Sequence, residues 1–256
     1  MSFRDLHYAT DPLLLPNAWD AGSAIAFAEA GFRAVGTTSF GVGAASGRPD
    51  GARASKDGTV RLVRALAGLP VYVSADIEDG YSDDPGEVAA FAAALAASGA
   101  DGVNIEDSTD EALIDPGRHA AKIAEIKRRA PGMFVNARAD NYWLGQDATI
   151  PAVLARAAAY ADAGADGVFV PGAADPADLE QLAAGIPVPV NVLAVPRLTL
   201  ADLARTGVRR VSTGSLPYRA AMDAAVAAAA QIRDGGTPPP ATPYAQAQAR
   251  LAKYAG

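Results

Sequence analysis

Short apolar runs alternate with Ala-rich stretches along most of the chain. Several of these runs are apolar throughout, which is typical of parallel strands that are covered on both faces. One local pattern recurs, in which an Ala-rich helical stretch ends at a Gly and a short apolar strand follows. This pattern is found around Gly31, Gly99, Gly164 and Gly207. It is the helix-to-strand joint of a repeated βα unit.

The pattern predicts eight βα units and therefore an α/β fold, a (β/α)8 barrel of the TIM type. A doubly wound open sheet is the alternative, but no Gly-x-Gly-x-x-Gly sequence follows the first strand. The expected strands cover residues 13–15, 34–37, 71–75, 102–105, 134–137, 167–170, 188–192 and 210–213. The expected helices cover residues 21–30, 55–67, 85–98, 117–129, 150–163, 177–184, 200–205 and 220–233.

We expect residues 1–256 to form a single barrel domain. Half of the 256 residues are apolar, and α/β barrels of this length usually form one domain. The last part, residues 235–256, differs from the rest. It begins with a linker rich in Gly and Pro and ends in a short amphipathic helix expected at 244–254. This C-terminal helical tail is expected to pack on a neighbouring element or on a second subunit.

Composition excludes several classes of function. The chain has no Cys, so disulfides, thiolate metal sites and a thiol nucleophile are absent. The net charge is −7 and the 22 basic residues form no long run, which argues against nucleic acid and anionic membranes as partners. No apolar stretch is long enough to span a bilayer, and the start of the chain lacks the pattern of a signal peptide. We therefore expect a cytoplasmic protein.

Charged residues stand at the ends of three consecutive predicted strands. Asp76 and Glu78 follow the third strand, Glu106 ends the fourth, and Arg138 and Asp140 follow the fifth. In a (β/α)8 barrel, the carboxyl ends of the strands meet at the face that carries the active site. Each residue alone could cap a helix or form an ion pair. Together they indicate a site for a divalent cation and an anionic substrate.

We expect this cation to be Mg2+, with Mn2+ as the alternative. Asp76 and Glu106 are the first expected ligands, and Asp50 and Glu78 are further metal-site candidates. Arg138 is expected to bind a substrate carboxylate or stabilise a developing enolate, and it could also form an ion pair with Glu106. Glu106 and Arg138 are therefore the main catalytic candidates.

Further candidates surround this expected site. The loop after the second strand is rich in Gly and hydroxyl groups and could bind a carboxylate. Its candidates for substrate binding are Thr38, Ser39 and Phe40, together with Asp50. Asn191, on the seventh strand, is an additional substrate-binding candidate. Tyr81 is a candidate proton donor, although core packing would also explain it.

Two other mechanisms are disfavoured by where the relevant residues fall. The four Lys residues lie on expected helices or in the tail, so a Schiff-base mechanism is not expected. His7 and His119 are not at strand ends. A His-rich metal site or a Ser-His-Asp triad is therefore also not expected.

Five short segments carry a resemblance to the isocitrate lyase/phosphoenolpyruvate mutase superfamily. They are Gly36-Thr37-Thr38-Ser39, Gly47-Arg48-Pro49-Asp50-Gly51, Ser74-Ala75-Asp76, Gly102-Val103-Asn104-Ile105-Glu106-Asp107 and Asn136-Ala137-Arg138. The resemblance covers nearly the whole barrel. It implies an Mg2+-dependent barrel enzyme that cleaves or forms C–C or P–C bonds in small 2-oxo or 2-hydroxy acids. It also implies a homodimer or homotetramer that exchanges the last helix.

The resemblance assigns roles to individual residues. Asp76 matches the second acid of an Asp-x-Asp metal motif, Glu106 a Glu of the metal shell, and Asp50 an acid linked through water. Arg138 matches a substrate-binding Arg. Thr38 and Ser39 match the segment that binds a substrate carboxylate.

The chain also departs from the pattern of this superfamily. Ser74 stands where the motif has its first acid, and Glu78 or Asp79 could supply the missing ligand. The lyases have a Lys-Lys-Cys-Gly-His loop after the metal-shell Glu, whereas this chain has Ser108-Thr109-Asp110-Glu111. It therefore lacks the catalytic loop of isocitrate and methylisocitrate lyases.

Three functional hypotheses follow. The first is an Mg2+-dependent C–C lyase or decarboxylase that acts through an enolate on a small 2-oxo or 2-hydroxy dicarboxylic acid. The second is a mutase or hydrolase of the P–C bond in a phosphonate such as phosphonopyruvate. The third is a binding protein for 2-oxo acids without catalysis.

Overall fold

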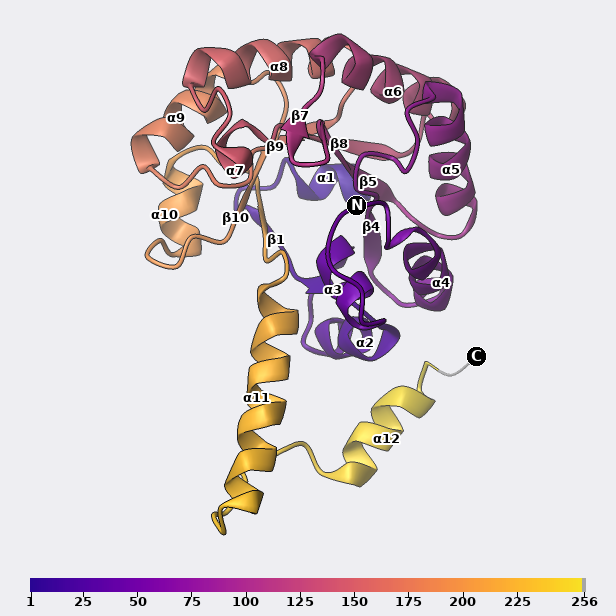
Figure 1. Ribbon diagram of the computed structural model, residues 1–256, viewed down its shortest axis with the longest axis vertical. Coiled ribbons are helices and arrows are strands. Elements are labelled where there is room, and N and C mark those ends of the chain that lie inside the picture. Colours follow the sequence, from indigo (N-terminus) through magenta and orange to yellow (C-terminus); the bar gives the residue numbers. More distant parts are fainter. Residues whose placement is uncertain (255–256) are drawn as a thin grey trace.

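The computed structural model describes residues 1–254 and contains the predicted (β/α)8 barrel (Figure 1). The main sheet is parallel throughout, in the order β1-β11-β10-β9-β8-β5-β4-β3-β2. All eight predicted strands are confirmed to within about two residues at their ends. The strands are β1 (Leu13–Leu15), β2 (Asn17–Ala18), β3 (Ala34–Thr37), β4 (Tyr72–Asp76), β5 (Gly102–Glu106), β8 (Phe134–Arg138), β9 (Gly167–Phe169), β10 (Val190–Leu193) and β11 (Arg210–Ser212).

The helices that connect successive strands lie along the outer side of the sheet (Figure 1). Four of them begin with a capping Asp or Thr followed by a Pro in the first turn, which favours a sharp start. The helices of the barrel are α2 (Ala21–Glu29), α4 (Lys56–Leu66), α5 (Pro85–Ala97), α6 (Pro116–Arg129), α8 (Ile150–Asp162), α9 (Pro176–Gly185) and α10 (Leu200–Arg205).

The first strand closes the barrel in two halves around Pro16. Its first half, β1, pairs with β11, and its second half, β2, pairs with β3. The side chain of Asn17 joins the same two neighbours. Its Nδ2 donates to the carbonyl of Thr37 (2.7 Å), and its Oδ1 accepts from the backbone N–H groups of Thr213 (3.0 Å) and Gly214 (2.9 Å). One buried amide therefore holds the seam of the barrel.

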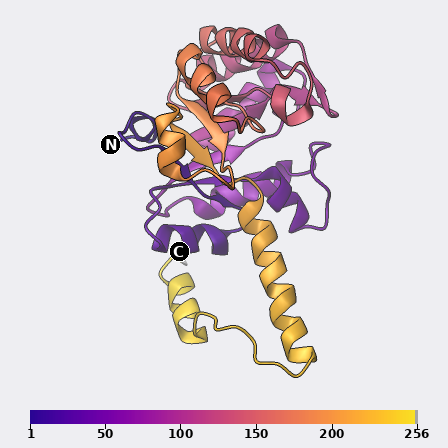
Figure 2. The ribbon, with the colours of Figure 1, turned by 90° about the vertical axis from the view of Figure 1, so that its left-hand side faces the viewer.

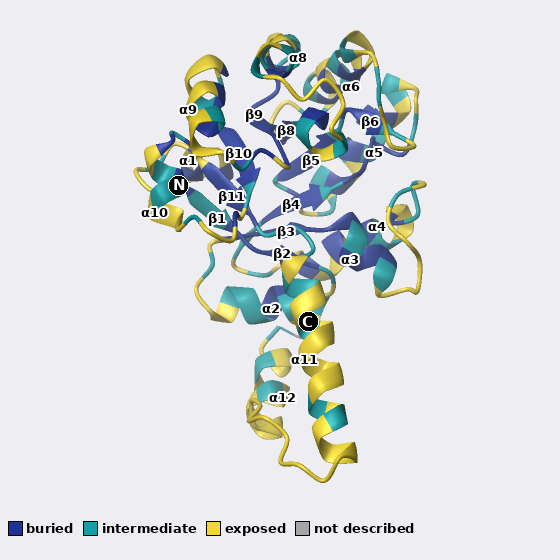
Figure 3. Cartoon of the chain, turned by 60° about the vertical axis from the view of Figure 1, so that its left-hand side comes forward, coloured by how far each residue is buried: buried dark blue, intermediate teal, exposed yellow. Residues whose placement is uncertain are grey.

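The core has two parts. A large cluster fills the space between the strands and the outer helices, and the strands are buried along most of their length (Figure 3). A small cluster fills the bottom of the barrel, where the short helix α1 (Phe3–Leu6) covers the amino ends of the strands. It consists of Phe3, Leu6, Leu15, Ala34 and Phe134. The centre of the bottom is thus filled by apolar side chains.

Some short elements were not predicted. The hydroxyl of Thr38 accepts from the N–H of Gly41, and this cap starts α3 (Ser39–Ala44) inside the expected Gly-rich loop. A hairpin, β6 (Ser108–Thr109) and β7 (Ala112–Leu113), follows β5. Its turn residues Asp110 and Glu111 both have positive φ, 51° and 60°. Two consecutive positive φ angles suit a tight hairpin turn, but Glu rarely adopts one, so the Asp110-Glu111 pair is a weak signal for this hairpin. The helix α7 (Asn141–Leu144) follows β8.

The C-terminal tail leaves the barrel (Figure 2). Helix α11 (Leu216–Arg233) has no buried residue, and it exposes Met222, Val226 and Ile232. Helix α12 (Tyr244–Ala252) then returns towards α2, where Lys253 binds Glu29 (2.6 Å). Exchange of the last helix between subunits stays a prediction. Within the described residues, no helix has both the length and the apolar character needed to cross a membrane.

Replacing Asn17 by Ala should destabilise the barrel seam. The change leaves the Thr37 carbonyl and the N–H groups of Thr213 and Gly214 without this partner, so we expect a loss of about 3 kcal/mol in the free energy of unfolding. Urea unfolding of the wild-type protein and the Asn17→Ala variant measures this loss. As a control, Thr213→Val removes only hydroxyl contacts and should cost about 1 kcal/mol. Equal losses for the two variants would contradict this role of Asn17.

A second prediction concerns His119, which is fully buried on α6 against Tyr160 (ring centroids 4.7 Å apart). Burial lowers the pKa of His119 to about 3 from its usual value of 6.5. In the unfolded chain His119 therefore takes up a proton below about pH 6.5, whereas in the folded chain it does so only near pH 3. The free energy of unfolding falls as the pH falls through this window.

Relative to a His119→Phe variant, the wild-type protein should lose about 2 kcal/mol of unfolding free energy between about pH 7 and pH 5. Urea unfolding of both proteins at the two pH values tests this. Because the other titrating groups are common to both proteins, their effects cancel in the comparison. Parallel pH profiles would show that His119 is protonated in the folded state.

Candidate functional site

A cavity of about 740 Å3 lies at the carboxyl ends of the strands. Residues that follow β3, β4, β5 and β8 form its walls. Of the strand-end residues singled out in the sequence, Glu78, Glu106 and Arg138 line it. The lining residues are Ser39, Asp50, Gly51, Ala52, Arg53, Glu78, Asp79, Asp83, Glu106, Ser108, Thr109, Asp110, Glu111, Arg138, Trp143 and Leu144. We call this cavity the mouth.

Asp76 ends β4 beneath the mouth. Its Oδ2 accepts from the backbone N–H of Ser39 (2.9 Å), and its own N–H donates to the hydroxyl of Thr37 (2.8 Å). Burial raises the pKa of Asp76, and nearby Asp50 raises it further, whereas the Ser39 N–H and Arg138 act in the opposite direction. A positive ion stabilises a buried carboxylate, and within the described chain no hydrogen bond reaches the second oxygen of Asp76.

Glu106 and Arg138 are register partners on β5 and β8 and form an ion pair across the mouth. Burial raises the pKa of Glu106 well above its usual value, and Asp76 and Asp140 add to the effect against the opposing influence of Arg138. Burial alone would lower the pKa of Arg138, but Glu106, Asp140 and Asp76 raise it. Arg138 therefore stays charged in a site with an excess of acids.

Three groups fix the position of the Arg138 guanidinium. Its Nε binds Asp140, a fully buried carboxylate, and its plane lies near the rings of Trp143 (5.6 Å) and Phe169 (5.9 Å). The other oxygen of Asp140 accepts from the hydroxyl of Ser108. The Arg138 fork is thus held in one orientation before any substrate binds.

A second buried acid supports this arrangement from behind. Asp107 accepts from the N–H of Asp140 (2.8 Å), from the hydroxyl of Tyr160 (2.5 Å) and from Arg156 (2.8 Å). Burial raises the pKa of Asp107, while the Tyr160 hydroxyl and Arg156 lower it. Asp107 therefore connects the mouth to helix α8.

Glu78 lines the mouth but is bound to a loop. Its Oε2 accepts from the N–H of Arg53 (2.9 Å), and its Oε1 accepts from the N–H (3.2 Å) and hydroxyl (2.5 Å) of Ser55. Burial is the main reason that the pKa of Glu78 is raised. In this arrangement Glu78 anchors the segment that carries Asp50, and it is not brought together with Asp76 as a ligand.

Tyr81 also lies away from the other candidates. Its hydroxyl contacts those of Ser55 (2.8 Å) and Thr59 (3.4 Å), and its ring packs against Phe91. Burial raises the pKa of Tyr81. The packing role considered for Tyr81 is the one that this geometry fits, and the structure does not bring its hydroxyl into the mouth.

The substrate-binding candidates occupy different depths. Ser39 reaches the mouth, whereas the Thr38 hydroxyl caps α3 and Phe40 packs against Tyr218 (5.9 Å). Asn191 is buried inside the barrel, where its Oδ1 accepts from Ser212 (3.2 Å). Of the loop after β3, therefore, Ser39 and Asp50 face the cavity.

The carboxylates expected to bind the cation are spread around the mouth. In the described part of the chain, no three His, Cys, Asp or Glu side chains are grouped closely enough to hold a metal ion. Metal binding by the four expected acids stays a prediction, and Glu78 would have to leave its loop contacts to take part. Asp76, Glu106 and Asp50 remain close enough to influence one another. Mg2+ commonly takes one or two carboxylates and keeps several waters, so this oxygen donor set fits it.

Two features of the mouth were missed in the sequence. Arg53 makes a forked contact with Asp79 (2.6–3.0 Å) and also binds Asp83 (2.9 Å), which joins the loops after α3 and β4. Arg53 has a positive φ of 59° and lies in a long loop, so no periodic signal pointed to it. Trp143, 55% exposed, gives the mouth an aromatic edge. Because Trp143 follows closely after the strand that ends at Arg138, its position in the sequence could have predicted that it lies at the mouth.

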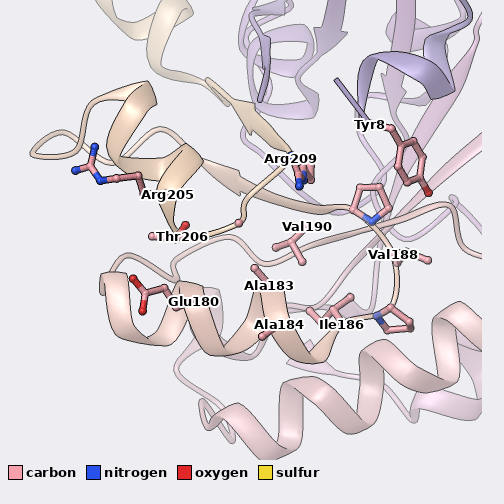
Figure 4. A pocket seen from close by; sticks show the side chains of 13 residues that line it. Tyr8, Glu180, Ala183, Ala184, Ile186, Val188, Val190, Arg205, Thr206 and Arg209 are labelled. Atoms are coloured by element: carbon pink, nitrogen blue, oxygen red, sulfur yellow. The ribbon is translucent and has the colours of Figure 1, made fainter. Parts of the chain in front are cut away.

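A second cavity, of about 530 Å3, lies at the opposite, amino ends of β10 and β11 (Figure 4). Small and aliphatic side chains from α9 and β10 make up much of its wall. The charged residues Glu180, Arg205 and Arg209 are spread around it. It contains no pair of acids and lies away from the strand-end cluster, so the mouth is the better candidate for chemistry.

Fold and mouth together define a (β/α)8-barrel enzyme that gathers acids and one Arg at its strand ends. More specifically, the chain belongs to the phosphoenolpyruvate phosphomutase family, whose model matches residues 3–233. The resemblance to the isocitrate lyase/phosphoenolpyruvate mutase superfamily is thereby confirmed. Members of this superfamily are lyases and mutases.

The chain is similar to several individual proteins. An uncharacterized protein of Mycobacterium tuberculosis (strain ATCC 25618 / H37Rv) is 55% identical over 254 residues, which are 99% of this chain and 97% of that protein. The 2-methylisocitrate lyase of Bacillus subtilis (strain 168) is 34% identical over 202 residues, covering 73% of this chain and 64% of the lyase. A phosphonopyruvate hydrolase in complex with oxalate and Mg2+ has a TM-score of 0.82 and 25% identity, covering 92% and 89% of the two chains.

Proposed function

We propose that this protein is a cytoplasmic, Mg2+-dependent C–C lyase or decarboxylase that acts on a small 2-oxo or 2-hydroxy dicarboxylic acid through an enolate. One observation carries the proposal. The mouth is lined by seven acidic residues but by only two Arg residues. An anionic substrate would be repelled by such a surface unless a divalent cation bridged it to the acids.

The distribution of the two Arg residues sharpens this argument. Arg53 forms ion pairs with Asp79 and Asp83, so its positive charge is already balanced by carboxylates of the protein. Arg138 is paired with Glu106 and Asp140, yet one face of its fork borders the cavity. A cation taken up by Asp76 and Glu106 would loosen the hold of Glu106 on Arg138. Arg138 would then be able to bind a substrate carboxylate.

Asp76 and Glu106 would hold the cation, and Asp50 would hold it through water. When bound, the cation supplies a Lewis acid that binds a 2-oxo acid and offsets negative charge. Ser39 would orient a substrate carboxylate from the wall after β3. Arg138, fixed by Asp140 and the two aromatic rings, would stabilise the charge that develops when the C–C bond breaks.

Cleavage of the P–C bond in a phosphonate is the second candidate. The phosphonopyruvate hydrolase structure, bound to oxalate and Mg2+, supports it through family membership. The shortage of cations in the mouth argues against it, because a phosphonate carries more negative charge than a carboxylate. The tail supports a homodimer or homotetramer, since an exchanged α11 would cover its exposed Met222, Val226 and Ile232.

Cation binding can be tested without knowing the substrate. Asp76→Asn and Glu106→Gln should each weaken Mg2+ binding, measured by calorimetry, by about 10–100-fold or more. Asp110→Asn is the matched control. It removes a carboxylate that lines the same mouth, and Asn tolerates the positive φ of this turn residue. Equal effects of all three changes would indicate a diffuse acidic surface and no defined site.

Turnover is tested with a panel of 2-oxo and 2-hydroxy dicarboxylic acids plus phosphonopyruvate. We expect an Mg2+-dependent release of a 2-oxo acid or CO2 from a dicarboxylate, and an Arg138→Gln variant slower by about 100–1,000-fold in kcat. Phosphate release from phosphonopyruvate alone would establish the second candidate. Mg2+-dependent thermal stabilisation by oxo acids without turnover would establish a binding protein.

A further inference from the structure

The interior of the barrel beneath Asp76 contains a buried guanidinium without a carboxylate partner. Arg210, on β11, is 1% exposed. Its Nη2 donates to Asn104 Oδ1 (3.2 Å), and its Nε donates to the hydroxyl of Ser212 (3.2 Å). Both acceptors are neutral. By contrast, Arg138 and Arg156, which are also largely buried, each bind a carboxylate.

Arg210 keeps its charge in this environment. Burial lowers the pKa of Arg210 to about 9, and Asp76 opposes that effect. The guanidinium is therefore a cation at neutral pH. A buried cation without a counter-ion costs several kcal/mol, so this arrangement favours an anion nearby. Among the described residues, Arg210 forms no salt bridge with Asp76, and its side-chain hydrogen bonds go to Asn104 and Ser212.

Three buried polar atoms in this region have no hydrogen-bond partner in the described chain. They are Arg210 Nη1, Asn191 Nδ2 and Ser74 Oγ. The side chains are 1%, 1% and 2% exposed, so bulk water does not reach them. All three atoms can donate a hydrogen bond. Three unused donors, one of them charged, make up the donor set of an anion site.

The fold brings these donors towards one place. Asn191 and Arg210 are register partners on β10 and β11, and the hydroxyl of Ser212 bridges them. Ser74 lies two residues before Asp76 on β4, so it points into the barrel on the same face. The neighbouring strand β5 supplies Asn104, which already binds Arg210.

We propose that the barrel interior beneath Asp76 binds a small inorganic anion of the halide class through Arg210, Asn191 and Ser74. These three residues are buried and do not line the mouth, so the proposed ligand is a monatomic anion such as chloride and not a carboxylic acid. The site lies beneath the mouth, and in this proposal Asn191, a substrate-binding candidate from the sequence, binds the small anion in place of the substrate.

Crystals of the wild-type protein soaked in sodium bromide give the most direct test. We expect an anomalous peak inside the barrel within hydrogen-bond distance of Arg210 Nη1, Asn191 Nδ2 and Ser74 Oγ. An ordered water without anomalous signal at that place would overturn the proposal. So would an Arg210 side chain that is found paired with Asp76.

Thermal unfolding in solution gives an independent test. At constant ionic strength, replacing gluconate by chloride at ten times its dissociation constant should raise the unfolding midpoint by about 3 °C. The Arg210→Gln variant should lose this shift. Arg209→Gln is the matched control, because Arg209 is the adjacent residue, is exposed and should leave the shift unchanged.

If Arg210→Gln does not fold, Ser74→Ala serves in its place and should reduce the chloride shift by at least half. A chloride shift of the same size in wild-type protein, Arg209→Gln and Ser74→Ala would reflect a general salt effect and overturn the site. No shift in the wild-type protein would overturn it as well.

Discussion

The seam of the barrel at Asn17 is the constraint on which the rest of the structure depends. Pro16 has no N–H to donate, so the first strand is divided there, and its two halves pair with different neighbours. The Asn17 amide joins the end of β3 to the residues that follow β11. This connection reinforces the backbone pairing that closes the sheet, and closure places the acids on β4 and β5 in one barrel with the residues of the last strands.

The sequence predicted the barrel well because its signal is periodic. The Gly-terminated helices and apolar strands recur, and each unit reinforces the interpretation of the next. It predicted the mouth for the same reason, since strand ends in a parallel barrel must meet. Asp76, Glu106 and Arg138 follow from position alone. Their detailed pairing, with Ser39 on Asp76 and Asp140 on Arg138, depends on side-chain directions that no periodic pattern carries.

The parts that could not be predicted lie in loops with uncommon backbone angles. Arg53, Glu78 and Tyr81 all have positive φ, although none is Gly, Asn or Asp. Glu78 is directed to Ser55 by this local geometry, a contact that a simple period of two along β4 does not predict. Strain of this kind persists only where the surrounding contacts over-determine it, and here the Arg53–Asp79 fork supplies those contacts.

Charge in this barrel is organised along its axis. The bottom is apolar, the middle holds Arg210 among neutral amides, and the mouth carries an excess of acids around Arg138. Asp76 interacts electrostatically with both guanidinium groups. If a cation at the mouth engages Asp76, less of its charge is left to compensate Arg210, and the demand for an anion below increases. Cation binding at the mouth and anion binding in the interior would then be coupled through the carboxylate of Asp76. Each of the two binding events is still measured separately.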